Sequence, residues 1–368
     1  MTASIWPGLI ILSGIAALLA LLLEIARGVI ADYPDVALTI NRKKTLTVKG
    51  GAPLLSTLQD QGIFLPSACG GRGTCALCKA RIEEGGGPVL PTETPYLTEE
   101  EIRDGIRLSC QIKVRGDLKI EIPEELFQVQ EYRTRTERIS TLTPFIKAFR
   151  FHVLEPEEGV SFLPGQYIQL QIPAGKSSQA PPYRAYSIAS SASEPRHIDI
   201  IVARIDKGEV STYLHERLRE GMELTMRGPF GDFYLREGDR DLLFVATGSG
   251  LAPILAILRH MAESGIRRRT TLYFGNRRPD DLFGMEELRD LGKSLPGFHF
   301  VPVLSRIPPG TTWTGERGRV TDLIQKNITR NAPLDVYICG SSGMVEDSRS
   351  RLLEKGIPSE RIFFDRFD

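Results

Sequence analysis

The stretch Cys69-Gly-Gly-Arg-Gly-Thr-Cys75-Ala-Leu-Cys78 places three cysteines in one glycine-rich loop, and a fourth cysteine, Cys110, follows in Arg107-Leu-Ser-Cys-Gln. Four thiolates at this spacing are the ligand set of a [2Fe–2S] cluster. The glycines agree with this interpretation, because a loop around a negatively charged cluster needs residues with positive φ and backbone amides that point at sulfide. The stretch therefore predicts an iron–sulfur domain.

Two other interpretations of these cysteines are open. Structural zinc sites usually combine two short Cys-x-x-Cys pairs, whereas the arrangement here is three plus one. A structural disulfide requires an oxidising compartment. The chain has five cysteines, and only Cys339 lies outside the set of four, so an internal disulfide cannot form while the cluster is intact. We predict a cluster in a reducing compartment.

The pattern Cys-x5-Cys-x2-Cys with a distant fourth cysteine resembles the plant-type and adrenodoxin-like ferredoxins. Its five-residue first gap is similar to that in the ferredoxin domain of the F subunits of sodium-translocating NADH:quinone reductases. The resemblance implies an α+β β-grasp fold for residues 34–128. It also implies four metal ligands, which are Cys69, Cys75, Cys78 and Cys110.

Local signals in this region predict its first elements. Alternating runs on either side of Asn41-Arg-Lys-Lys indicate a hairpin, and an amphipathic helix is expected from Pro53 to Gln61, ended by Gly62. The spacing Thr98-Glu-Glu-Glu101 is a capping box for a further short helix.

Composition limits the class of protein. With 368 residues and 41% hydrophobic residues, the chain is long enough for two or three domains, each with its own core. The formal net charge is zero, so no basic face predicts a nucleic-acid partner. We expect a multidomain globular protein that binds no nucleic acid.

The N-terminal residues 1–30 contain an uncharged apolar run, Ile5 to Leu23. Nineteen helical residues rise about 28 Å, which is enough to cross the hydrocarbon layer. A cleaved signal peptide is disfavoured because Met1-Thr-Ala-Ser has no basic region, and a buried core helix is the third possibility. We predict a single-pass membrane anchor helix.

The orientation of this anchor follows from basic residues on its C-terminal side, because positively charged flanks stay in the cytoplasm. Those residues are Arg27, Arg42, Lys43 and Lys44. We therefore expect a protein of the cell inner membrane with its C-terminal domains in the cytoplasm, where nicotinamide cofactors are.

Residues 129–237 contain short strand-like runs punctuated by Gly and Pro, which predict an all-β antiparallel barrel. Within them, Tyr183-Arg-Ala-Tyr-Ser187 resembles the flavin signature of the ferredoxin-NADP reductase-like family. The resemblance implies that Arg184 pairs with an FAD phosphate, that Tyr186 stacks on the isoalloxazine, and that Ser187 approaches the flavin N5 edge.

Two neighbouring motifs support FAD. Gly208-Glu-Val-Ser-Thr212 precedes a predicted helix, whose first amides can bind a pyrophosphate. The residues implied are Val210, Ser211 and Thr212. Gly228-Pro-Phe-Gly-Asp-Phe233 resembles the turn that follows in the same family.

Residues 238–368 change to an α/β pattern. The apolar strand Leu242 to Ala246 leads into a glycine loop and a helix, which together form a phosphate cradle. The loop resembles the nicotinamide site of the reductase family, and the residues implied are Thr247, Gly248, Gly250 and Pro253. Arg277 follows the next strand, where adenosine is expected, and we predict NADH rather than NADPH as the cofactor.

Two further segments are expected on the nicotinamide side. Cys339-Gly340-Ser-Ser-Gly-Met344 resembles the Cys-Gly-Pro-x-x-Met motif of the family, with Ser341 in place of Pro. A buried, inert thiol is the alternative for Cys339. Near the C-terminus, Phe367 matches an aromatic residue that covers the flavin in this family. The catalytic residues implied are Ser187, Cys339 and Phe367.

The order of anchor, ferredoxin, FAD barrel and nicotinamide domain resembles that of the F subunits of sodium-translocating reductases. It implies a membrane-bound NADH oxidoreductase in which NADH delivers two electrons, FAD releases them singly, and the [2Fe–2S] cluster passes them to a downstream acceptor. That acceptor is expected to be a protein or the membrane redox subunits of a quinone-reducing complex, with sodium transport as a further implication. The alternatives are the reductase of a phenol or aromatic hydroxylase-type oxygenase and a tethered redox sensor.

Overall fold

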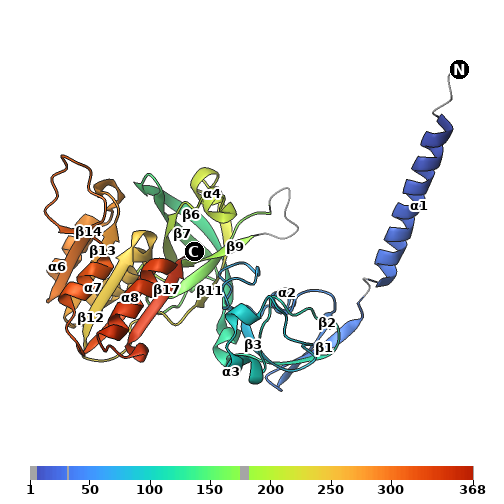
Figure 1. Ribbon diagram of the computed structural model, residues 1–368, viewed down its shortest axis with the longest axis horizontal. Helices are drawn as coiled ribbons and strands as arrows, with labels where there is room; N and C mark the ends of the chain where they lie inside the picture. The colour runs from blue at the N-terminus through green and yellow to red at the C-terminus, as the bar shows by residue number, and fades with distance from the viewer. Residues whose placement is uncertain (1–5, 31–32, 175–181, 368) are drawn as a thin grey trace. The chain divides into compact units, whose positions relative to one another are not determined.

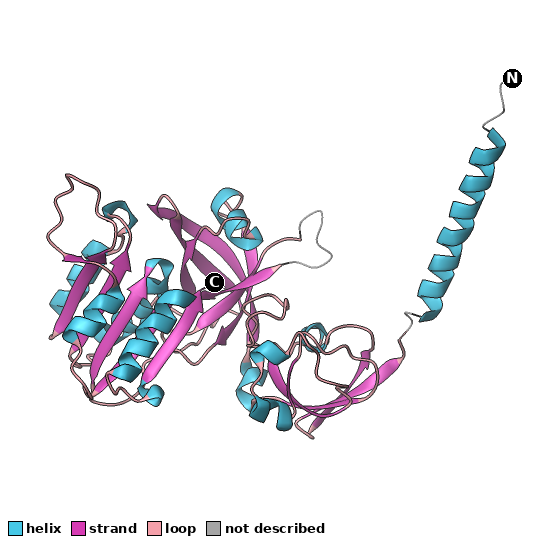
Figure 2. Ribbon diagram, viewed as in Figure 1, coloured by secondary structure: helices cyan, strands magenta, loops and turns pink. Residues whose placement is uncertain are grey.

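The computed structural model describes residues 6–30, 33–174 and 182–367 (Figure 1). The chain divides into two compact units, Met1–Gln128 and Val129–Asp368. The first unit contains an N-terminal helix and a small mixed sheet. The second contains an antiparallel barrel and a parallel α/β domain (Figure 2).

Helix α1 (Trp6–Ile30) covers most of the apolar N-terminal run. The described side chains from residue 8 to residue 22 are all exposed, and they include Leu9, Ile10, Leu12 and Leu18. Within the part of the chain that the structure describes, no helix is both long enough and apolar enough to cross a membrane. The predicted helix is therefore confirmed from Trp6 onward, its first residue Ile5 lies outside the described residues, and the predicted membrane span is not confirmed.

The rest of the first unit is a five-stranded mixed sheet with strand order β2-β1-β5-β3-β4, in which β1 and β5 are parallel. Its strands and helices are β1 (Asp35–Ile40), β2 (Lys44–Lys49), α2 (Leu54–Asp60), β3 (Lys79–Glu84), η1 (Thr94–Tyr96), α3 (Glu99–Arg103), β4 (Ile106–Leu108), β5 (Leu118–Glu121) and η2 (Glu124–Gln128). The expected hairpin is the β1–β2 pair, and the expected capping box at Thr98 and Glu101 is present at α3.

The core of this sheet also encloses part of the cysteine loop. Leu38, Leu54, Leu58 and Leu108 are fully buried in one apolar cluster, and Cys78 and Cys110 belong to the same cluster. Two of the four predicted ligand thiols are therefore fixed by the packing that holds the domain together.

The second unit begins with a six-stranded sheet of order β10-β7-β6-β11-β8-β9, whose neighbouring strands pair in the antiparallel direction. An antiparallel bridge between Ile188 and Ile200 joins the two ends, so the sheet closes into the predicted barrel. Its elements are β6 (Gln130–Thr143), β7 (Ile146–Glu155), β8 (Tyr167–Gln171), β9 (Tyr183–Ser187), β10 (His197–Ala203), α4 (Glu209–Glu216) and β11 (Glu223–Phe230).

The C-terminal part is a parallel six-stranded sheet of order β15-β14-β13-β12-β16-β17 with helices on both faces. Its elements are β12 (Asp241–Thr247), η3 (Gly248–Gly250), α5 (Leu251–Glu263), β13 (Thr270–Asn276), η4 (Pro279–Asp281), α6 (Met285–Ser294), β14 (Phe298–Leu304), β15 (Glu316–Arg317), α7 (Val320–Asn327), β16 (Leu334–Ser341), α8 (Ser342–Glu354), η5 (Ser359–Arg361) and β17 (Ile362–Phe367).

The alternation of side chains along β12 accounts for the two covered faces. Leu242 and Phe244 point into the cluster formed with α5 and α6, whereas Leu243 and Val245 point into the cluster formed with α7 and α8. Because both faces are buried, the strand is a continuous apolar run in the sequence.

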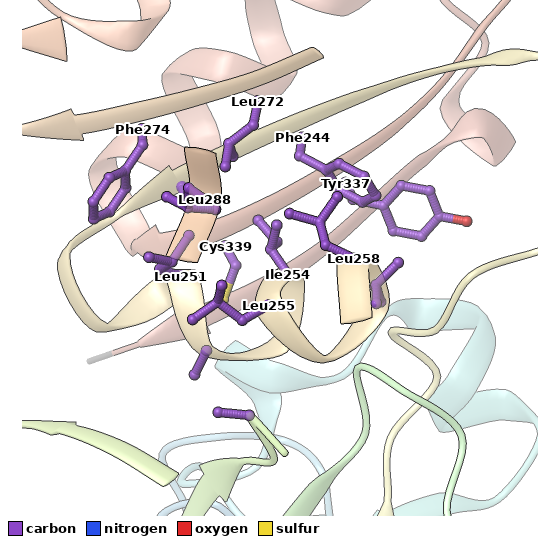
Figure 3. Packing of buried hydrophobic residues seen from close by; sticks show 14 of the residues in the cluster. Phe244, Leu251, Ile254, Leu255, Leu258, Leu272, Phe274, Leu288, Tyr337 and Cys339 are labelled. Carbon is purple, nitrogen blue, oxygen red and sulfur yellow. The ribbon is translucent and has the colours of Figure 1, made fainter. Parts of the chain in front are cut away.

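The barrel contributes to the first of these clusters. Ile146, Ile201 and Phe233 of the barrel segment are buried together with Leu251 and Ile254 of α5. Figure 3 shows the part of this cluster in which Cys339 lies beside the α5 side chains. The barrel and the α/β domain therefore share one apolar core.

Candidate functional site

The four predicted ligand cysteines are arranged as two pairs. The Cys75 thiol donates a hydrogen bond to Cys69 Sγ across 3.4 Å, and Cys78 and Cys110 are hydrogen-bonded to each other. All four thiols are free, which argues against the disulfide alternative. In a [2Fe–2S] cluster, each of the two irons is bound by two cysteines, and the irons share two bridging sulfides. Two thiol pairs match this requirement.

Backbone groups of the loop point at these sulfur atoms. The Cys75 thiol, followed by N–H groups of Thr74, Arg72 and Cys75, lowers the pKa of Cys69 despite its partial burial. The Cys75 thiol would lose its proton on binding iron, whereas the backbone N–H groups would remain to stabilise the Cys69 thiolate, which is the form that binds iron. The loop can turn its amides inward because Gly70, Gly71, Gly73 and Ala76 all have positive φ.

Within the described residues, no group of three or more His, Cys, Asp or Glu side chains could hold a single metal ion. The two pairs, the inward amides and the φ values fit a [2Fe–2S] cluster, and Cys69, Cys75, Cys78 and Cys110 are the residues that would hold it.

The predicted flavin residues lie on β9, which pairs with β8 so that Tyr186 is opposite Ile168 and Ser187 is opposite Tyr167. Arg184 is half-buried and donates to the Tyr183 carbonyl from Nη1 at 2.7 Å. Burial raises the pKa of Tyr186 above its ordinary range, so its phenol stays neutral. Strand β9 thus carries a cation, an aromatic ring and a hydroxyl within four residues.

The predicted pyrophosphate segment is the first turn of α4. Val210 and Ser211 are buried, and the Thr212 N–H donates to the Gly208 carbonyl at 2.9 Å. The Ser211 hydroxyl closes this turn itself, because it accepts from Ile205 N–H at 3.2 Å and donates to Gly208 O at 3.3 Å. Ser211 therefore shapes the turn with its side chain, a role that the motif alone did not indicate.

The predicted nicotinamide residues meet where β12 and β16 end side by side. Strands β13 and β14 lie on one side of β12, and β16 and β17 lie on the other, so ligands are expected at this point of the sheet. A Cβ on Gly250 would lie 2.3 Å from the Cys339 carbonyl oxygen. A Cβ on Gly340 would lie 2.3 Å from Thr247 Oγ1 and 2.6 Å from Met344 Cε. Only glycine allows the two loops to approach this closely.

The remaining predicted nucleotide residues surround this junction. Gly248 has φ of +53°, and Pro253 is buried in the first turn of α5, where a missing N–H costs no helical hydrogen bond. Arg277 is exposed directly after β13, and its carbonyl accepts from Arg306 N–H at 2.8 Å.

A residue that the sequence analysis missed completes the junction. The Asp365 carboxylate accepts a hydrogen bond from Ser187 Oγ at 3.4 Å, and Asp365 is the register partner of Cys339 in the parallel β16–β17 pair. Burial raises the pKa of Asp365 to about 6, although the Arg366 N–H and the Ser187 hydroxyl oppose this effect. Ser187 and Asp365 thus form a polar pair between barrel and α/β domain, and Cys339 neighbours Asp365 in strand register.

Cys339 is fully buried, and Figure 3 shows its side chain beside Leu251, Ile254 and Leu255. Burial, followed by the charge of Asp365, raises the pKa of its thiol, so the sulfur is protonated. Phe367 ends β17 opposite Ser341 and is partly buried against the same apolar cluster. Because residues two apart share a face of a strand, Asp365 and Phe367 lie on the same side of β17.

Family models match three segments of the chain. They are described as a 2Fe-2S iron-sulfur cluster binding domain at residues 38–115, an oxidoreductase FAD-binding domain at residues 134–234, and an oxidoreductase NAD-binding domain at residues 244–350. The matched segments contain the cysteine loop, strand β9 and the glycine loop after β12. The chain is therefore an NADH-dependent flavin and iron–sulfur oxidoreductase, and the predicted cofactors FAD, [2Fe–2S] and NADH are confirmed.

Full-length relatives identify the family. The chain is 31% identical to the F subunit of Na(+)-translocating NADH-quinone reductase from Neisseria meningitidis serogroup C, over 98% of each chain. It is 30% identical to the protein of the same name from Klebsiella pneumoniae, again over 98% of each chain. The chain belongs to the family of the F subunits of Na(+)-translocating NADH-quinone reductases, and the resemblance found in the sequence is confirmed.

Solved structures share the fold. The Amycolatopsis cytochrome P450 reductase GcoB superposes with a TM-score of 0.74 at 24% identity, over 90% of this chain and 98% of its own. The ferredoxin reductase in carbazole 1,9a-dioxygenase gives a TM-score of 0.70 at 24% identity, over 91% of this chain and 99% of its own. The predicted combination of ferredoxin, FAD and nucleotide domains is thereby confirmed at the level of fold.

Proposed function

We propose that this chain is the NADH-entry subunit of a membrane-bound, quinone-reducing complex, and that it passes electrons from NADH through FAD and the [2Fe–2S] cluster to membrane redox subunits. The observation that carries the proposal is the full-length similarity to relatives that are named for NADH-quinone reductase activity. When bound, FAD accepts a hydride and the cluster accepts single electrons, so the chain converts a two-electron donor into one-electron steps.

The nicotinamide end of this route is assigned to the junction of β12 and β16. The glycine loop Gly248–Gly250 and the first turn of α5 bind the NADH pyrophosphate through backbone N–H groups, with Thr247 and Pro253 shaping the approach. Gly340 and Met344 form the opposite wall, and Arg277 binds the adenosine side.

The flavin end is assigned to β9 and α4. Arg184 offers its guanidinium to an FAD phosphate, Tyr186 offers its ring face to the isoalloxazine, and the first turn of α4 at residues 210–212 binds the pyrophosphate. Ser187 lies at the flavin edge, and its one hydroxyl hydrogen, which points at Asp365 in the structure, turns from the carboxylate to the flavin when FAD is bound. Phe367 covers the flavin from the end of β17.

Helix α1 is proposed to hold the chain at the cell inner membrane with the cofactor domains in the cytoplasm. Its described side chains include Leu9, Ile10, Ile11 and Leu12, which are between 51% and 69% exposed. An apolar helix surface of this kind is stabilised by contact with lipid or with apolar helices of partner subunits. Removal of residues 1–30 is expected to release the chain from membranes while NADH-to-ferricyanide turnover continues.

The proposal is tested with membranes and the purified full-length chain. Adding the chain to membranes that lack it should restore NADH-driven quinone reduction, whereas Cys110→Ser protein, which keeps NADH-to-ferricyanide turnover, should restore none. Efficient electron delivery to a soluble oxygenase component, together with no quinone reduction in membranes, would instead assign the chain to an oxygenase system.

A further inference from the structure

The fourth ligand cysteine, Cys110, has a side-chain amide beside its sulfur. Gln111 Nε2 donates a hydrogen bond to Cys110 Sγ at 3.5 Å. Sulfur is larger than oxygen, so a separation of this size is a normal contact for an N–H···S bond. Because this donor belongs to a side chain, it can be removed by substitution without changing the loop backbone.

A second hydrogen bond fixes which end of the amide faces the sulfur. Thr92 Oγ1 donates to Gln111 Oε1 at 2.9 Å. A carboxamide has one accepting and one donating end, so an Oε1 atom that is engaged by Thr92 leaves the NH₂ group directed at Cys110. Thr92, Gln111 and Cys110 Sγ therefore form an ordered relay.

Thr92 is held in place by a buried ion pair. The neighbouring residue Glu93 is fully buried and receives Arg107 Nη2 at 2.5 Å and the Leu108 N–H at 3.0 Å. Arg107 also donates to the carbonyls of Gly87 at 2.9 Å and Pro88 at 3.0 Å. The segment that carries Thr92 is thus attached to β4, close in sequence to Cys110.

The cysteine loop closes over the same amide from the other side. A Cβ on Gly73 would lie 2.6 Å from Gln111 Nε2, so the loop backbone passes directly against the amide group. The partly exposed Gln111 side chain is therefore in contact with Gly73, Thr92 and the Cys110 sulfur, and these contacts set its orientation.

We propose that Gln111, oriented by Thr92, is a positioning residue that raises the reduction potential of the [2Fe–2S] cluster through its hydrogen bond to Cys110 Sγ. Reduction adds one electron to a centre that is already negatively charged, and a donor directed at a ligand sulfur stabilises the more negative state more strongly. The inference rests on the cluster and not on the identity of the acceptor. It adds a potential-setting side chain to the cysteine ligands.

The test is a reductive titration of the purified full-length chain with dithionite and mediators, followed by electron paramagnetic resonance of the reduced cluster. Gln111→Leu keeps the side-chain volume and removes the donor. We expect its ratio of reduced to oxidised cluster at a fixed potential to fall about tenfold, which is ~59 mV for a one-electron couple. Gln111→Glu should lower the potential at least as far, because a carboxylate adds negative charge beside the sulfur.

Variants of Thr92 test whether the orientation of the Gln111 amide, and not the packing around it, sets the reduction potential of the cluster. Thr92→Val removes the hydroxyl without changing the volume and should lower the potential in the same direction as Gln111→Leu, whereas Thr92→Ser restores the donor and should return the wild-type value. Gln128→Leu makes the same substitution at an exposed position of the same unit and should leave the potential unchanged.

A Gln111→Leu protein with two irons per chain, wild-type thermal unfolding and an unchanged midpoint potential would overturn the proposal. If Gln111→Leu binds no cluster, Thr92→Val decides the question, because an unchanged potential in that variant shows that the relay has no influence. NADH oxidation by ferricyanide serves as the folding control for the second unit in every variant.

Discussion

The cysteine loop and the nicotinamide junction reach their geometries in different ways. Three of the four cluster thiols come from ten consecutive residues, and their backbone turns inward through local positive-φ residues. At the junction, Ser187 and Asp365 are 178 residues apart and are joined only because β9 of the barrel and β17 of the parallel sheet meet. A local site depends on its own loop, whereas an assembled site depends on packing far from the reacting atoms.

The largest expected effect is loss of the cluster from the cysteine loop. Cys75→Ser should abolish the cluster, because a hydroxyl does not replace a thiolate at the paired position beside Cys69. FAD should stay bound and NADH-to-ferricyanide turnover should persist. Iron and sulfide analysis with visible spectroscopy checks this outcome, and loss of FAD from the same protein would show that the two sites are not independent.

The nicotinamide junction should be disrupted by a substitution that removes no functional group. In Gly250→Ala the new methyl would lie 2.3 Å from the Cys339 carbonyl, so the two loops must separate. Overpacking of this kind costs about 1–3 kcal/mol, and we expect NADH binding to weaken by roughly 10- to 100-fold. A titration of flavin reduction measures the affinity.

The matched control is Gly292→Ala in α6 of the same domain, where the added Cβ would have an ordinary contact of 3.6 Å with Phe298. Alanine is the better helix former by about 0.5–1 kcal/mol, so this protein should bind NADH normally. Equal affinities in the two variants would contradict the close approach of the two loops.

The buried ion pair beside the cysteine loop provides a stability test. Arg107→Met leaves Glu93 charged and buried, and removal of one partner of such a pair costs about 3–5 kcal/mol. We expect cluster loss at a lower temperature, with unfolding of the second unit unchanged. Arg81→Met removes an exposed pair with Glu121 and should change stability by less than about 1 kcal/mol.

A smaller effect is expected at Ser187. Ser187→Ala removes a hydroxyl that Asp365 orients, and the lost hydrogen bond is worth roughly 1–2 kcal/mol, or about tenfold in the rate of flavin reduction by NADH. Stopped-flow mixing measures that rate. A decrease of the same size in FAD affinity, with an unchanged reduction rate, would move the role of Ser187 from hydride transfer to cofactor binding.

Asp365 should give an effect on stability that is visible only as a pH dependence. Its pKa is raised to about 6 by burial, so its contribution to stability is greatest below the unfolded pKa near 4 and is lost as pH rises through about 6. The two pKa values differ by about two units, so the full decline is about 3 kcal/mol, of which about 2 kcal/mol falls between pH 4.5 and pH 8, and Asp365→Asn should remove it. Unfolding midpoints of both proteins at pH 4.5 and pH 8 test the sign, and parallel pH profiles would contradict it.

Features formed by one short segment could be predicted from the sequence, whereas features formed by distant segments could not. The cysteine loop, the β1–β2 hairpin, the capping box at Thr98 and the glycine loop after β12 are local signals, and each has the geometry its residues indicate. Asp365 was missed because its importance comes from strand register with Cys339 and contact with Ser187, neither of which is visible in a single segment. An acidic residue two positions before a terminal aromatic was the available signal.

Two side-chain roles could not be predicted from the sequence, for physical reasons. Ser211 was assigned to FAD from its motif, but its hydroxyl also closes the turn before α4, a hydrogen-bonding choice that sequence does not reveal. Gln111 follows a ligand cysteine without any motif of its own, and its relation to the sulfur depends on Thr92, nineteen residues earlier.

The apolar cluster shared by Ile146, Phe233 and Leu251 has a consequence for how such chains can be recombined. A crossover between two genes at residue 238 would join a barrel from one parent to a nucleotide domain from the other and would require their facing side chains to fit. A crossover between Gln128 and Val129 separates two compact units instead. We therefore expect recombination to preserve the second unit as one block and to allow exchange of the iron–sulfur unit alone.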